Sequence, residues 1–111
     1  MPSRKYLGEF ELMVILALIR LGENAYGVPI GREIEESSGR EVALGSVYAA
    51  LERLEEKGFV ASTMGEPTAE RGGRAKRYFC VTSAGLRQAR QSRAALTNLW
   101  RGVPELREER G

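Results

Sequence analysis

The chain has 111 residues, of which 42% are hydrophobic and 29% charged, and its formal net charge is +2. These values are typical of one small folded domain whose modest core is often completed by a partner chain. Since His and Asp are both absent, Ser-His-Asp triads and His-ligated zinc sites are excluded, and we expect neither an enzyme nor a metal or cofactor site.

No stretch of the sequence predicts a membrane span or a disulfide. The longest apolar run, residues 12–19, is far below the ~20 residues that cross a bilayer, and Glu9 and Glu11 directly before it argue against a signal peptide. Cys80 is the single cysteine, so no internal disulfide can form. We therefore expect a cytoplasmic protein with no membrane partner.

The small net charge hides a strong asymmetry. Residues 1–70 hold seven basic and twelve acidic residues, whereas residues 71–104 hold eight basic residues and no acid. The anion-binding surface is therefore expected to be local, as in a regulator that distinguishes DNA sites instead of binding any phosphate backbone.

The first predicted helix, Glu9 to about Leu21, is apolar nearly all round. One stripe comprises Phe10, Met13, Ala17 and Leu21, and the opposite side comprises Leu12, Ile15, Leu16 and Ile19. A helix of this kind is buried on more than one side. In so small a domain, we expect its second side to face another subunit.

The next two predicted helices form a helix-turn-helix. The earlier one spans Tyr26 to about Ser38, with Pro29 in its first turn, and a short connection after Gly39 leads to the stretch 44–60, LGSVYAALERLEEKGFV. In that stretch an apolar stripe predicts a short helix with Ser46 as an N-terminal cap and Gly58 at its end; the stripe is Val47, Ala50, Leu51 and Leu54.

The outward face of this later helix carries the candidate DNA-reading residues. Because the N-terminal part of a recognition helix meets the base edges, we expect Ser46, Tyr48 and Ala49 to read or position DNA, and Arg53 to contact a phosphate. For Tyr48 a half-buried packing ring is the open alternative. Glu52 and Glu56 also face outward, where they would repel phosphate unless they accept from a cytosine amino group or lie beyond the contact zone.

A basic β-hairpin follows. Residues 60–64 and 75–81 are strand-like, and the long loop between them is rich in Gly and cations. After a helix-turn-helix, we interpret the hairpin as a wing that meets the DNA backbone or minor groove, with a solvated loop as the alternative. Its candidate contacts are Arg71, Gly72, Gly73, Arg74, Lys76 and Arg77.

Cys80, in the second strand, has two interpretations. A buried thiol beside Phe79 and Val81 would act as a small hydrophobe, which we prefer, whereas an exposed thiol near Lys76 and Arg77 could serve as a redox sensor.

Thr82 is expected to cap a last helix that runs from Ser83 to about Trp100. An apolar stripe continues along it, interrupted by Arg93, and finds no obvious place in a three-helix core. We interpret the helix as a dimerisation element in preference to a fourth core helix. The predicted interface comprises Leu86, Ala89, Leu96, Trp100 and Val103.

The chain resembles the PadR family of bacterial transcriptional regulators. The resemblance covers about residues 6–100 and rests on five stretches together: LGEFELMVILALI, NAYGVPIGREIEE, LGSVYAALERLEEKGFV, RGGRAKRYF and VTSAGL. It implies a winged helix-turn-helix homodimer that usually represses transcription, with the last helix against the N-terminal region of the partner. It also implies release from DNA by aromatic or drug-like compounds; Trp100 could line such a site, although an interface anchor is preferred.

Residues and resemblance together predict a mainly α protein with a small β-hairpin, a winged helix-turn-helix with an added dimerisation helix. We expect a DNA-binding part over residues 6–81, the dimerisation helix over 82–103 and a charged tail over 104–111. The predicted function is a homodimeric repressor that binds an inverted repeat in double-stranded DNA. The alternative is a winged-helix module that binds a protein partner without specific DNA binding.

Overall fold

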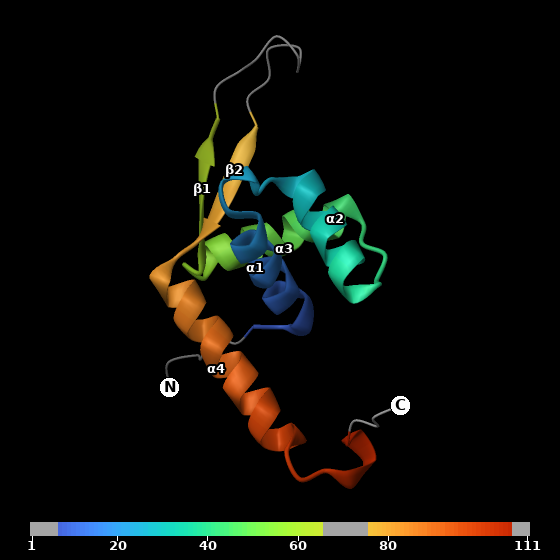
Figure 1. The fold of residues 1–111 in the computed structure, drawn as a ribbon. Coiled ribbons are helices and arrows are strands. Elements are labelled where there is room, and N and C mark those ends of the chain that lie inside the picture. Colours follow the sequence, from blue (N-terminus) through green and yellow to red (C-terminus); the bar gives the residue numbers. More distant parts are fainter. Residues whose placement is uncertain (1–6, 66–75, 108–111) are drawn as a thin grey trace.

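The computed structural model describes residues 7–65 and 76–107 and shows a bundle of three helices, a two-stranded hairpin and a fourth, protruding helix (Figure 1). The helices are α1 (Glu9–Leu21), α2 (Gly27–Ser38), α3 (Leu44–Glu56) and α4 (Ser83–Trp100). The strands are β1 (Val60–Met64) and β2 (Arg77–Val81). The predicted fold class is therefore confirmed. Within the described residues no helix is long and apolar enough to cross a membrane.

The core forms where α1, α2 and α3 meet. The stripe predicted in α3 is fully buried at Val47, Ala50, Leu51 and Leu54. Each of these residues removes apolar surface from water, which stabilises the fold by roughly 25 cal/mol per Å². The rest of the core comes from the other two helices, the connecting segments, the hairpin and the first half of α4: Val14, Ile15, Ala17, Leu18, Ala25, Ile30, Ile34, Phe59, Val60, Phe79 and Ala89.

Helix α3 begins differently from the sequence prediction. Its N-cap is Ala43, whose side chain makes no capping bond, so the prediction that Ser46 caps the helix is wrong. Instead, the Ser46 amide donates to the Ala43 carbonyl over 3.0 Å. Its end agrees with the prediction, because Gly58 directly follows the helix with φ of +80°, a conformation that favours glycine.

The hairpin is antiparallel, with Val60 paired to Val81 and Met64 to Arg77. Its second strand is also fixed to the helical bundle, because the Phe79 amide donates to the Ala25 carbonyl over 2.8 Å. Cys80 lies on the outward side of β2 and is exposed, so the preferred interpretation of a buried thiol is wrong.

Helix α4 starts against the core and then leaves it. Thr82 caps it as predicted, accepting from the Gly85 amide at 3.1 Å and donating to the Gly58 carbonyl at 2.7 Å. At Gly85 a Cβ atom would lie 2.2 Å from the Phe59 carbonyl oxygen, so this position needs glycine for the close approach. The second half of the helix extends away from the bundle (Figure 1). Hairpin and helix thus protrude from different sides of the core.

Candidate nucleic-acid interface

Helix α3 presents an exposed face next to its apolar stripe. Ser46, Ala49 and Arg53 are all exposed and share this face, as helical spacing requires. They line a hollow of about 470 Å³ together with residues of α1, α2 and the connection before α3: Phe10, Ile34, Arg40, Glu41, Val42 and Ala43. Three of the four α3 residues expected to contact DNA are therefore brought together at one accessible surface.

Tyr48 lies apart from this hollow. Its ring covers Gly27 at the start of α2 so closely that a Cβ atom there would come within 2.5 Å of the ring. The side chain nevertheless remains 40% exposed. Tyr48 thus packs between α2 and α3 and still presents an edge to solvent, so the two interpretations of this residue are compatible.

A buried carboxylate holds the C-terminal part of α3 against α1. Glu11 is only 6% exposed, and its carboxylate accepts from Lys57 Nζ at 2.9 and 3.0 Å and from the Gly8 amide at 2.8 Å. Arg53 Nε lies 3.7 Å away. Arg53, predicted to serve a phosphate, is therefore ion-paired within the chain while its side chain stays 52% exposed.

These contacts decide the ionisation of Glu11. Burial by itself raises the pKa of the carboxyl group, but the Gly8 and Lys57 hydrogen bonds and the nearby charges of Lys57 and Arg53 outweigh it and hold the pKa below its ordinary value. Glu11 is thus a charged structural link between α1 and α3.

On one side of the wing, a cation lies over an aromatic ring. Lys76 Nζ lies 3.8 Å from the ring centroid of Tyr26, the residue before α2. The Tyr26 and Tyr78 rings meet edge to face with their centroids 5.7 Å apart. The base of the wing is thereby packed against the start of the helix-turn-helix.

Another wing cation faces α3. Arg77 forms an ion pair with Glu55 of α3, its Nε donates to Ser62 Oγ at 3.1 Å, and Ser62 Oγ donates to Glu55 at 2.6 Å. The Arg77 guanidinium also lies 5.1 Å from the ring centroid of Phe79. The remaining predicted wing contacts, Arg71, Gly72, Gly73 and Arg74, lie outside the described residues.

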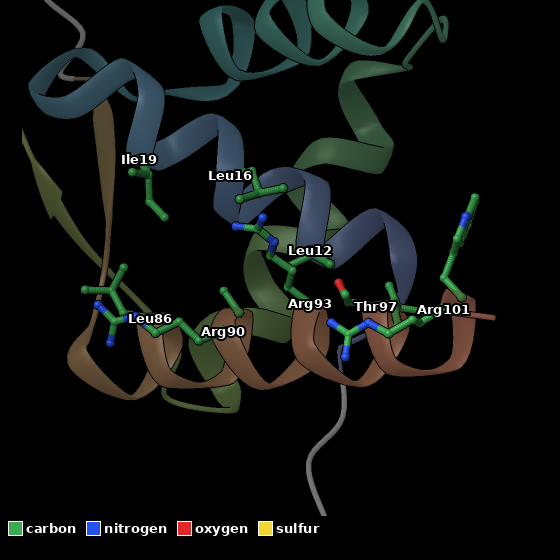
Figure 2. A pocket seen from close by; sticks show the side chains of 11 residues that line it. Leu12, Leu16, Ile19, Leu86, Arg90, Arg93, Thr97 and Arg101 are labelled. Atoms are coloured by element: carbon green, nitrogen blue, oxygen red, sulfur yellow. The ribbon is translucent and has the colours of Figure 1, made fainter. Parts of the chain in front are cut away.

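An apolar groove of about 640 Å³ separates α1 from α4 (Figure 2). Leu12, Leu16 and Ile19 line it from α1, and Leu86 lies across from them on α4. Leu16 and Ile19 are each nearly half exposed, so the second apolar side of α1 is left uncovered by the single chain. Other residues lining the groove are Ala89, Arg90, Arg93, Leu96, Thr97, Trp100 and Arg101.

The five residues predicted for the dimer interface fall into three groups. Leu96 and Trp100 line the groove and are exposed, and Leu86 lines it half-buried. Ala89 lines the groove but is already buried in the core of its own chain. Val103 follows the end of α4 and is half-buried there. Leu99, which lies off the predicted stripe, is 77% exposed.

The wing, the helix-turn-helix and the exposed face of α3 together define a winged helix-turn-helix protein, a class that presents a helix and a hairpin to a nucleic acid. The model of the PadR-like family of transcriptional regulators matches residues 15–91. The chain therefore belongs to the PadR-like family. No protein with a curated description matches it.

Solved structures share this fold. A PadR family transcriptional regulator from Eggerthella lenta is 28% identical, with a TM-score of 0.68 over 92% of this chain and 88% of that one. A transcriptional regulator from Clostridium thermocellum is 21% identical, with a TM-score of 0.72 over 88% and 92% of the two chains. A PadR family regulator from Clostridium difficile is 21% identical, with a TM-score of 0.68 over 83% and 91%.

Proposed function

We propose that the protein is a homodimeric transcriptional repressor that binds an inverted repeat in double-stranded DNA. The observation that carries this proposal is the exposed face of α3, Ser46, Ala49 and Arg53, beside a hairpin fixed to the same helical bundle. In this proposal residues 6–81 bind DNA, residues 82–103 dimerise and residues 104–111 form a charged tail.

At the DNA, the two parts have separate roles. The small side chains of Ser46 and Ala49 let α3 enter the major groove closely, and Tyr48 and Arg53 contact the edge of the groove or a phosphate. The wing supplies Arg71, Gly72, Gly73, Arg74 and Lys76 to the backbone, with Arg77 at its base. Changes in Ser46 or Ala49 should alter which sequence is preferred, whereas loss of Arg74 should weaken binding to all sequences alike.

Dimerisation is supported by the exposed apolar side chains of α1 and α4. Leu16, Ile19, Leu96 and Trp100 are each about half exposed and lie along one groove. Such a patch marks an association surface in a small soluble protein. Two-fold symmetry would place the two α3 helices in successive major grooves about 34 Å apart, so the half-sites should be centred about one helical turn apart.

The same groove supports an effector as a further element of the proposal. Its volume and apolar lining suit a small aromatic compound, and Trp100 offers a ring for stacking. A ligand bound there would change how α4 and α1 meet and would release DNA through the dimer geometry.

The salt dependence of binding tests this function against the alternative of a protein-binding module. For a duplex fragment from upstream of its own gene, the logarithm of affinity should fall with the logarithm of salt concentration with a slope of about −0.9 per phosphate contact. A dimer makes twice as many contacts as one subunit. A measured affinity for duplex DNA that is negligible at low salt would contradict the proposal and favour a protein partner, which a pull-down would then seek.

A further inference from the structure

The two described cations at the base of the wing are both engaged within the chain. Lys76 lies over the Tyr26 ring, whereas Arg77 pairs with Glu55 of α3. Successive side chains of an extended chain point to opposite faces, so the two contacts hold opposite faces of the hairpin base. One face is fixed to the start of α2 and the other to the last turn of α3.

The Glu55 carboxylate ties both strands to α3 at once. One of its oxygens accepts from Arg77 of β2, and the other accepts from Ser62 of β1 at 2.6 Å. The two strand residues also contact each other, because Arg77 Nε donates to Ser62 Oγ at 3.1 Å. The Arg77 side chain is 42% exposed and that of Glu55 33%, so water weakens the ion pair, but the network of three hydrogen bonds fixes its geometry.

We propose that Glu55 and Arg77 are positioning residues that set the angle between the wing and α3, a role that rests on the proposed binding of DNA by both. Arg77 then acts through Glu55 and does not serve a phosphate. Removing the Glu55 charge has opposite effects on DNA affinity, depending on whether Glu55 positions the wing or acts only through its charge. If only attraction to phosphate mattered, Glu55→Gln would strengthen DNA binding, because a negative charge disappears near the DNA surface. If Glu55 positions the wing, the same change weakens binding.

The test is a set of titrations of one duplex from upstream of the gene with the full-length dimer. We expect Glu55→Gln and Arg77→Gln each to weaken binding about tenfold, within the usual coupling range for residues of one network. The exchange of the pair, E55R with R77E, should restore affinity to within about threefold of the wild type. Arg87→Gln is the matched control, because it removes one exposed cation from α4, where no ion pair is present among the described residues.

The salt slope gives an independent readout. A positioning role predicts the wild-type slope for Arg77→Gln, whereas a phosphate contact predicts a slope less steep by about 0.9 per subunit. Tighter binding by Glu55→Gln, or an exchanged pair that stays as weak as Arg77→Gln, would overturn the proposal.

Failure of the proposed function would look different, because the wild type itself would then bind no duplex DNA. In that case the contact of Glu55 with Arg77 and Ser62 would be tested by amide hydrogen exchange in the hairpin. If amide hydrogens exchange faster in Glu55→Gln and return to the wild-type rate in the double variant E55R with R77E, the contact holds the hairpin in place. An unchanged rate in Glu55→Gln would reject that role.

Discussion

The arginines around α3 and those along α4 are placed in contrasting surroundings. Arg40, Arg53 and Arg77, near α3 and the wing, are ion-paired with glutamates from other elements. Arg90 and Arg93 of α4 make no such pair within the described residues and line an apolar groove instead.

The apolar side chains show the same division. The stripe of α3 is completely buried, whereas Leu96, Leu99 and Trp100 of α4 are more than half exposed. The apolar stripe of α3 is therefore covered within one chain, while these three side chains of α4 are not. The comparison shows that α3 buries its apolar stripe within one chain, whereas α4 leaves large apolar side chains uncovered, as the proposed dimer would require.

The contrast between α3 and α4 is tested most strongly by making the same substitution, Leu to Ala, in each helix. Leu51→Ala in α3 leaves a cavity where the side chain is fully buried, so the free energy of unfolding should fall by about 2–5 kcal/mol. Leu99→Ala in α4 should change the unfolding of the single chain by less than about 0.5 kcal/mol. Urea unfolding at several protein concentrations measures both. Equal losses at all concentrations would show that α4 is buried in its own chain.

Association is expected to depend on the groove. Leu96→Glu places a charge on a surface that the proposed dimer buries, so dimer dissociation should increase by about a hundredfold or more. Asn98→Glu is the matched control, since Asn98 is exposed on α4 and does not line the groove. Analytical ultracentrifugation gives both dissociation constants. The assignment of the groove to the dimer would fail if the control dissociated as readily as Leu96→Glu.

A smaller effect concerns Glu11 and pH. Its folded-state pKa is lowered, so below its unfolded pKa of about 4.3 the unfolded chain binds more protons and stability falls as pH falls. Glu11→Gln should cost about 1–3 kcal/mol at neutral pH, and this cost should shrink as pH falls below the unfolded pKa, because the wild type loses stability there and the Gln side chain does not titrate.

Urea unfolding from pH 3 to pH 7 measures this convergence, with the exposed Glu52→Gln as control. A cost of Glu11→Gln that stays constant over the whole range would mean that the carboxylate charge does not stabilise the link between α1 and α3.

The elements were predictable because their signals are local. The stripe of α3, the cap at Thr82 and the stop at Gly58 each follow from a few neighbouring residues, and the structure confirms them. The exposed face at Ser46, Ala49 and Arg53 follows from the same helical period.

Local patterns did not indicate the start of α3 or the contacts between distant segments. Ser46 does not cap α3, because the helix begins two residues earlier, at Leu44. Ala89 packs into its own core because Gly85 lets the start of α4 lie against the Phe59 backbone. The exposure of Cys80 depends on which face of the hairpin meets the bundle. The bridge between Arg77 and Glu55 joins residues 22 positions apart, so no local pattern indicates it.

The most direct test of the account is the preference of the purified protein for its own upstream region over random-sequence duplex at near-physiological salt. A self-contained DNA-facing part on a symmetric dimer predicts tighter binding to the upstream fragment by about a thousandfold or more. Equal and weak binding to both, reproduced on fragments that tile the neighbouring genes, would contradict the claim that α3 and the wing form a sequence-specific DNA reader.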